Sequence, residues 1–222
     1  SRMLDEIKSQ PPTYFHEIPL YIKDEEIQLL FFRQCFDREW ISDEFLKLWC
    51  DLLSKRGVPW DAEEAYSPAW ILRKVCLEQG GDSIAWLMWA KQEEQENGAG
   101  EYGRENTARW IYREACLKHR ADSHTWLAWG QLEERQNNVG GLDYKTENTA
   151  RWIYQEACMN HSGNGAVWRA WGQLEEHQNN IGGLDYKTEN TARWIYREAC
   201  LKHQADSHTW LAWGQLEECQ NN

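Results

Sequence analysis

Residues 106–138 read NTARWIYREACLKHRADSHTWLAWGQLEERQNN, and this stretch decides the fold. It returns with substitutions at residues 148–180 and again at residues 190–222. The copies begin 42 residues apart, and the third differs from the first at only two positions. Self-similarity at a fixed period of this size is typical of a solenoid, in which each unit buries its apolar face against its neighbours.

Each copy carries the pattern of two amphipathic helices. In the first, Ala108, Ile111 and Ala115 recur at steps of three and four, which places them on one helical face. Trp126 and Trp129 do the same in the second. In every unit a good N-capping residue stands four positions before the place that Trp126 holds in this second helix. These residues are Ser42, Asp82, Asp122, Asn164 and Asp206.

A small residue occupies one fixed position of the tryptophan-bearing helix. It is Gly130, Gly172 or Gly214 in the clear copies, and Ala90 or Cys50 in the earlier units. We expect two helices to approach closely there, with an aromatic ring of the partner helix supplying the missing bulk. A leucine at Gly172 should therefore overpack the seam and lower the melting temperature.

The spacing resembles that of the tetratricopeptide repeat, which shows W-x2-L-G-x2-Y and then A-x3-F. Trp126 and Trp129 with the glycine that follows, and Ala108 with Tyr112, match this pattern, whereas Glu133 stands where that family has tyrosine. This departure resembles the half-a-tetratricopeptide (HAT) variant, whose helices carry two aromatics and a Glu in one and A-R-x-I-Y-x2-A in the other. The resemblance implies an all-α fold, an α-solenoid of about five helix-turn-helix repeats in a right-handed superhelix.

The repeat domain is expected over residues 24–222, with ten helices in five hairpins, after an irregular arm over residues 1–23. The eight residues GGLDYKTE at 140–147 return unchanged at 182–189 and exceed the family unit. They either form a binding edge or brace neighbouring units. Because the chain opens with Ser1 rather than Met, we expect it to be a fragment of a longer protein.

The composition is acidic, with 36 Asp and Glu against 24 Lys and Arg and a formal net charge of −12. A negative protein repels phosphate, so RNA would be contacted only indirectly, if at all. No run of about eighteen apolar residues occurs, so no membrane span is expected. Seven cysteines without a C-x2-C pair indicate buried packing in a reducing compartment. We expect the cytoplasm, or the nucleus for a eukaryotic HAT protein.

Aromatic residues form a further repeated feature. All of the fifteen tryptophans except Trp40 and Trp60 fall on three repeat positions. Aromatics at fixed helical spacing favour a core role, and the rival interpretation is an exposed stacking platform for sugars or bases.

Motifs of catalysis are missing from the sequence: there is no G-x4-G-K-[ST], no G-x-S-x-G and no H-E-x2-H. The adjacent carboxylates Glu133 and Glu134 recur from unit to unit, which makes a ladder rather than one active site. We therefore predict a protein that is not an enzyme and that needs no cofactor and no metal. Pairs of opposite charge are expected at the helix seams: Glu133 with Arg109, Glu175 with Arg151, and Glu217 with Arg193.

In tetratricopeptide arrays the first helix of each unit lines the concave face, and the resemblance gives that place to the tryptophan-bearing helix. If Trp126, Trp129 and Glu133 face the core, two columns of residues face the groove. The acidic column consists of Glu94, Glu134, Glu176 and Glu218, and the glutamine column consists of Gln131, Gln173 and Gln215. The amides of the glutamine column can bond a peptide backbone. The alternative is that these residues only solvate the surface. The candidate partner-binding residues are Lys91, Glu94, His124, Leu127, Gln131, Glu134, Arg169, Gln173, Glu176, His208, Gln215 and Glu218.

The leading functional hypothesis is a non-catalytic scaffold that binds a protein or a basic extended peptide. A second hypothesis, implied by the resemblance, is a component of an RNA-processing complex. A third is the regulatory or sensor module of a larger protein whose effector domain, such as a protease, lies outside this chain. Self-association through apolar solenoid ends is also open.

Overall fold

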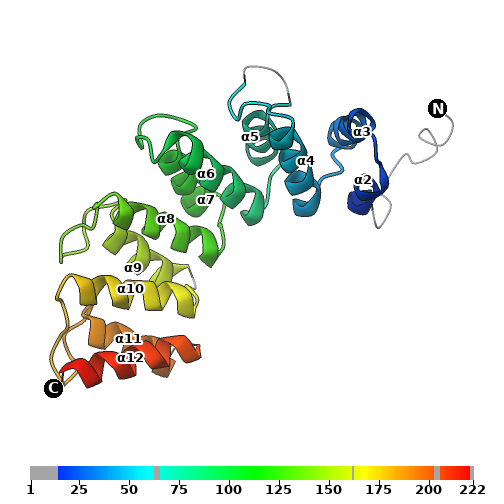
Figure 1. Ribbon diagram of the computed structural model, residues 1–222. Coiled ribbons are helices and arrows are strands. Elements are labelled where there is room, and N and C mark those ends of the chain that lie inside the picture. Colours follow the sequence, from blue (N-terminus) through cyan, green and yellow to red (C-terminus); the bar gives the residue numbers. More distant parts are fainter. Residues whose placement is uncertain (1–14, 63–65, 162, 203–205, 221–222) are drawn as a thin grey trace. The chain divides into compact units, whose positions relative to one another are not determined.

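The computed structural model describes residues 15–62, 66–161, 163–202 and 206–220, and these residues form helices, turns and loops without a strand. Figure 1 shows the order of the helices. They are η1 (Phe15–Glu17), α2 (Ile18–Tyr21), α3 (Glu25–Asp37), α4 (Asp43–Lys55), α5 (Pro68–Glu78), α6 (Ser83–Asn97), α7 (Ala108–Lys118), α8 (Ser123–Arg135), α9 (Ala150–Asn160), α10 (Gly165–His177), α11 (Ala192–Lys202) and α12 (Ser207–Gln220).

The chain divides into two compact units, Ser1–Trp89 and Ala90–Asn222, and the boundary falls within α6. In the first unit α3 packs on α4, and α4 packs on α5. Its core is aromatic: the rings of Phe32 and Trp49 are stacked with centroids 5.7 Å apart, and Phe45 meets Phe32 edge-on at 5.0 Å. The apolar faces of these helices thus pack against one another in the core of this unit.

The N-terminal arm is only partly as predicted. Residues 1–14 lie outside the described part, but residues 15–21 form the short helices η1 and α2. Pro19 stands in the first turn of α2, where its missing N–H costs no helical hydrogen bond. The prediction of an irregular arm is therefore wrong for these residues.

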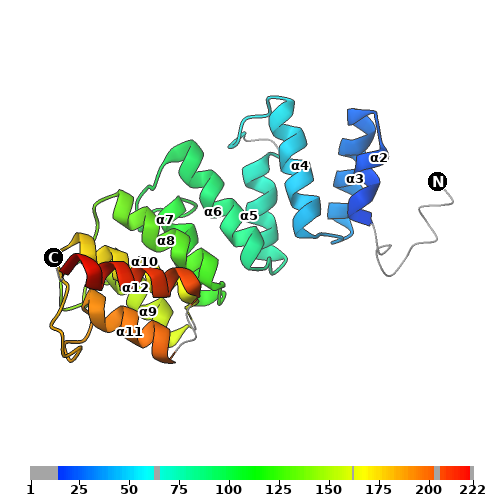
Figure 2. The same cartoon turned by 60° about the horizontal axis from the view of Figure 1, so that its bottom comes forward.

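The second unit is a stack of helices in two layers. Each helix from α7 to α12 packs on the next, α8 also contacts α10, and α10 also contacts α12. In Figures 1 and 2, α8, α10 and α12 accordingly lie side by side, and we call them the tryptophan layer. None of the described helices is long and apolar enough to cross a membrane.

Ten predicted helices correspond to α3 through α12, and the predicted caps are confirmed. Asp122, for example, accepts hydrogen bonds from the backbone N–H groups of His124 and Thr125 at the start of α8. The sequence pattern predicts that the first helices of the last three hairpins begin at Glu105, Thr146 and Glu189, but they begin three or four residues later, at the starts of α7, α9 and α11. Asn148, with φ of 61°, lies in the left-handed region, so α9 cannot begin before it.

Most repeat tryptophans lie in the core, as predicted. Trp126, Trp129, Trp168 and Trp171 are almost fully buried. The tryptophans of the first helices are half-buried instead. The repeated cysteines are also buried and unpaired, as expected: Cys76, Cys116, Cys158 and Cys200.

Close helix approach at the repeated glycine is confirmed. A Cβ at Gly130 would lie 2.6 Å from Cζ of Tyr154, and one at Gly172 would lie 2.6 Å from Cζ of Tyr196. Real Cβ atoms do not come so close to a ring. The tyrosine of each following helix therefore packs on a backbone surface that only glycine provides.

Candidate binding surface

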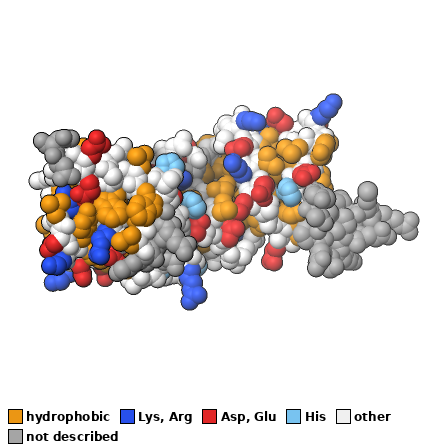
Figure 3. Space-filling view, turned by 90° about the horizontal axis from the view of Figure 1, so that it is seen from below, with side chains coloured by type: hydrophobic (Ala, Val, Ile, Leu, Met, Phe, Trp, Pro, Cys, Tyr) orange, Lys and Arg blue, Asp and Glu red, His pale blue; other side chains and the backbone are white. Residues whose placement is uncertain are grey.

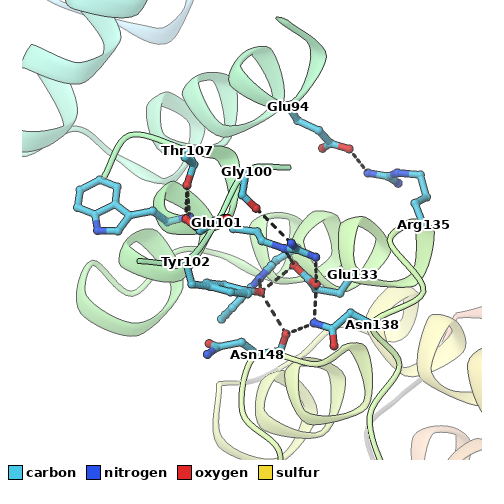
Figure 4. A network of polar contacts seen from close by, with 12 residues as sticks. Glu94, Gly100, Glu101, Tyr102, Thr107, Glu133, Arg135, Asn138 and Asn148 are labelled. Carbon is cyan, nitrogen blue, oxygen red and sulfur yellow. Dashed lines mark hydrogen bonds and ion pairs between the residues drawn. The ribbon is translucent and has the colours of Figure 1, made fainter. Parts of the chain in front are cut away.

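A buried carboxylate lies at the seam of the helices in each repeat. Glu133 on α8 has an exposed fraction of 0%, and Arg109 of α7 donates to both of its oxygens at 2.8 Å. The hydroxyl of Tyr102 and the amide of Asn138 each donate to it at 2.7 Å (Figure 4). A carboxylate taken out of water is tolerated when it is paired and its lone pairs are bonded. The predicted Arg109–Glu133 pair is confirmed, as part of a larger network.

The network recurs one period later around Glu175. Arg151 donates to its two oxygens at 2.7 and 3.0 Å, and the Tyr144 hydroxyl and the Asn180 amide each donate at 2.7 Å. That hydroxyl accepts a hydrogen bond of 3.0 Å from the indole of Trp171. The core tryptophan, the loop tyrosine and the ion pair thus form one connected set of hydrogen bonds.

The third copy keeps the pair and changes its surroundings. Arg193 donates to Glu217 at 3.1 Å, Tyr186 donates at 2.9 Å, and the Trp213 indole donates directly to the carboxylate at 3.3 Å. Although burial raises it, the hydrogen bonds from Arg193 and Tyr186 hold the pKa of Glu217 below its usual value. All three predicted arginine–glutamate pairs are therefore present.

The repeated GGLDYKTE loop acts as a brace through its tyrosine. Tyr144 is buried and reaches the carboxylate of the following repeat, while Leu142 of the same loop is exposed. The loop glycine is also required: Gly140 has φ of 90°, and a Cβ there would lie 2.7 Å from Cβ of Thr149. Its carbonyl accepts a hydrogen bond from Arg151. Sequence periodicity signals this tyrosine, because Tyr102 precedes it by one period, but its bond to the seam was not foreseen.

The acidic column has partners inside the chain. The hydroxyl of Tyr154 donates to Glu134, and that of Tyr196 donates to Glu176, each from the helix that follows. Burial raises the pKa of Glu134, although the Tyr154 bond opposes the shift. Glu134 and Glu176 are half-buried parts of the seam, and a lysine at either would disturb packing as well as surface charge.

Charges along the tryptophan layer are paired between neighbouring helices. Arg135 of α8 pairs with Glu94 at the end of α6. Arg169 of α10 donates to both carboxylate oxygens of Asp206 at 3.1 Å. Hydrogen bonds from Thr209 and then from Arg169 lower the pKa of Asp206 to about 2. These contacts tie one repeat to the next.

A column of amides remains at the surface of this layer. Its members, one per repeat, are exposed: Gln131, Gln173 and Gln215. Four residues farther along each helix lies a position that differs in all three copies and is exposed in all of them: Arg135, His177 and Cys219. The first and third copies, which otherwise differ only at Arg120 and Gln204, therefore differ at a position that faces solvent.

The twelve predicted binding residues fall into two groups. The exposed residues are Lys91, His124, Gln131, Gln173, His208, Gln215 and Glu218. The half-buried residues are Glu94, Leu127, Glu134, Arg169 and Glu176. The structure thus leaves the glutamine column available to a partner and ties four charged members into contacts between helices.

The first unit contains a surface pocket at the start of α4. Asp43, Asp82, Glu39 and Gln79 are among the residues that line it. Burial, followed by repulsion from Asp82, raises the pKa of Asp43 to about 6. Over the described part of the chain, no three His, Cys, Asp or Glu side chains gather as ligands of a metal ion.

No protein-family model matches the chain, and no curated protein matches it.

Proposed function

We propose that the second unit is a non-catalytic scaffold that binds a protein segment along the tryptophan layer. The observation that supports this most is the exposed column of Gln131, Gln173 and Gln215, one amide per repeat on helices that pack side by side. A primary amide both donates and accepts hydrogen bonds, so a row of them can bond the N–H and C=O groups of an extended backbone.

Specificity would come from the residues beside the amides. Arg135, His177 and Cys219 differ in charge and size at one exposed position of the repeat. The buried network around Glu133 and Glu175 supports this division, because it holds the helices in place without using the exposed face. A rigid framework lowers the entropic cost of binding.

The preferred partner is a basic segment. A formal net charge of −12 attracts a cationic chain over long range and speeds its association. Because Glu134 and Glu176 already accept tyrosine hydroxyls, the attraction comes from the overall field more than from those two carboxylates. Binding should therefore weaken as salt is added.

The resemblance to HAT repeats supports a role in assembling proteins and leaves an RNA-containing complex as the alternative. Capture experiments with and without nuclease separate the two. The chain is used as bait in a lysate of its source cells, and captured proteins are then purified for direct affinity measurement.

The test compares two variants with the same charge change, one within α8 and α10 and the other at their C-caps. Gln131→Lys with Gln173→Lys alters the amide column, whereas Gln136→Lys with Gln178→Lys alters exposed residues just past the helix ends. The first variant should weaken partner binding about tenfold or more, as expected for a central contact. The second should bind like the parent. Equal affinities of the two variants for the partner would refute binding through the amide column. If proteins are no longer captured after nuclease treatment, the RNA-dependent complex is favoured instead.

A further inference from the structure

The surface pocket at the start of α4 in the first unit, which we call the α4 pocket, has a volume of about 320 Å³. Its apolar lining includes Leu46, Val75 and Ala85, which are buried. Two carboxyl groups also line it: that of Asp43, the first residue of α4, and that of Asp82, which precedes α6. An apolar lining with a few polar groups is the usual composition of a ligand site.

The charge inside the α4 pocket is unbalanced. Asp and Glu side chains occur in many places on the face seen in Figure 3, so negative charge alone does not mark a site. Of the described residues that line the pocket, however, Glu39, Asp43 and Asp82 are acidic and none is basic. Burial and then the charge of Asp82 raise the pKa of Asp43, as expected for carboxyl groups without a cation beside them.

The second unit contains the same carboxylate together with a cation. Asp206 holds before α12 the capping position that Asp82 holds before α6. Arg169 of α10 donates to both oxygens of Asp206 at 3.1 Å. In the first unit Lys47 of α4 stands at the repeat position of Arg169, but it is not among the residues that line the α4 pocket. The second unit thus supplies from its own chain the guanidinium that the lining of the pocket does not.

The repeat also distinguishes Asp43. Directly after the cap, the later repeats carry only small uncharged residues: Ser83, Ser123, Gly165 and Ser207. Space is limited at this position in the second unit, since a Cβ at Gly165 would lie 3.1 Å from the backbone nitrogen of Asp206. The α4 pocket therefore places a second carboxylate beside the capping one, at a point where the other repeats have none.

A third acceptor belongs to Gln79. Its side-chain carbonyl oxygen is buried and accepts no hydrogen bond from the described part of the chain, and the residue lines the α4 pocket. A guanidinium carries five N–H donors in one plane, so it can donate to two carboxylates and a carbonyl at once. The methylene stem of an arginine can lie on apolar side chains. The pocket thus offers both the acceptors and the surface that an arginine side chain needs.

We propose that the α4 pocket binds the arginine side chain of a partner protein. The guanidinium donates to the carboxylates of Asp43 and Asp82, and a further N–H group donates to the carbonyl of Gln79. The arrangement repeats the way in which Arg169 binds Asp206 within the second unit. This proposal goes beyond the amide column, since it concerns the first unit and a single side chain rather than an extended backbone.

The test is an NMR titration of the whole chain with the capped peptide acetyl-Gly-Arg-Gly-amide. The backbone N–H groups of Ile84 and Ala85 donate to Asp82 at 3.0 Å, so their resonances should shift saturably. The same peptide with citrulline, which has the shape of arginine without its charge, should bind at least about tenfold more weakly, because charge-assisted hydrogen bonds are lost. Free arginine should also bind more weakly, because its own carboxylate is repelled.

Two variants with the same charge change separate the pocket from the general acidity of the chain. Asp43→Asn should weaken binding of the arginine peptide about tenfold or more, because a charged acceptor is lost. Glu44→Gln alters the exposed next residue, which does not line the pocket, and should bind like the parent.

The affinity should also depend on pH. Asp43 is faced by Asp82 and by Glu39 of the lining, Glu44 adjoins it on α4, and α5 contributes no charged residue to the pocket. The pKa of Asp43 is about 6, and one unit below its pKa about nine tenths of an acid is protonated. Lowering the pH from 7.5 to 5 should therefore weaken binding about tenfold in the parent and much less in Asp43→Asn.

Two sets of outcomes overturn the proposal. The first is the absence of saturable shifts, or equal affinities for the arginine and citrulline peptides. The second is equal affinities of Asp43→Asn and Glu44→Gln, or free arginine that binds more tightly than the peptide, which would assign the pocket to a small guanidine. The Gln131→Lys, Gln173→Lys variant should bind this peptide like the parent, which keeps the two proposals separable.

Discussion

The same substitution should have opposite effects at two equivalent glycines. Gly172→Ala and Gly214→Ala place one methyl group at the same helical position, in α10 and in α12, 42 residues apart. Local sequence is similar at the two sites, since both lie in a W-G-Q-L-E-E stretch. What differs is the neighbour: the ring of Tyr196 covers Gly172, and nothing in the described chain lies within 4 Å of a Cβ at Gly214.

The magnitudes follow from these contacts. Alanine in place of glycine inside a helix stabilises by about 1 kcal/mol, and at Gly214 no other effect opposes it. At Gly172 the new Cβ would lie 2.6 Å from Cζ of the fully buried Tyr196. Displacing that ring costs about 1–3 kcal/mol as overpacking, and losing its bond to Glu176 costs about 1.5–3 kcal/mol. The net destabilisation is about 1.5–5 kcal/mol.

Thermal unfolding followed by far-ultraviolet circular dichroism measures the difference. For a chain of this size each kcal/mol shifts Tm by about 2–4 °C, so Gly172→Ala should lower Tm by about 3–20 °C. Gly214→Ala should raise Tm or slow hydrogen exchange within α12, since repeat arrays open locally. Gly130→Ala serves as a replicate of the covered site, because Tyr154 covers it in the same way. Equal effects at Gly172 and Gly214 would refute the argument that ring packing selects glycine.

Three further outcomes are expected. Tyr144→Phe removes a donor to the buried Glu175 and should lower the free energy of unfolding in urea by about 1–3 kcal/mol; an unchanged midpoint would show that the remaining donors suffice. The pKa of Asp43 is about 6 in the folded chain against an ordinary 3.8, so stability falls as pH rises between these values. Asp43→Asn should therefore raise Tm at pH 7.5 and leave it unchanged at pH 3, and a pH-independent shift would contradict this. A disulfide reagent should modify the exposed Cys219 first, while Cys158, whose buried thiol has a raised pKa, should react only on unfolding; similar rates would contradict the burial.

Periodicity was enough to predict the features that repeat on helices. The ten helices, their caps, the buried tryptophans and the Arg109–Glu133 pair all follow from residues at fixed spacing on a helical face. A helix fixes the direction of each side chain relative to the others, so spacing alone brings such groups together.

Loop geometry and lateral neighbours could not be predicted in this way. Tyr144 lies in a loop with φ of 56°, and no periodic pattern gives the direction of its hydroxyl. Helical projection placed Glu134 on the exposed side, but Tyr154 from the next helix covers its flank. The spacing of residues within one helix does not show which other helix packs against its side. That depends on how the hairpins pack against one another in space.

The buried network also determines how such a chain can grow. Each 42-residue block contributes one Glu, one Arg and one Asn to its own seam, and it contributes one Tyr to the seam of the next block. An in-frame tandem duplication of one block therefore adds a buried acid together with every donor that the acid needs. No interior charge is left unpaired by such an event, so a gene of this kind can lengthen by whole units without passing through an unstable intermediate. The near identity of the first and third copies, which stand two blocks apart, is what recent duplication of a two-block segment would leave behind, and such a segment also carries every donor that its acids need.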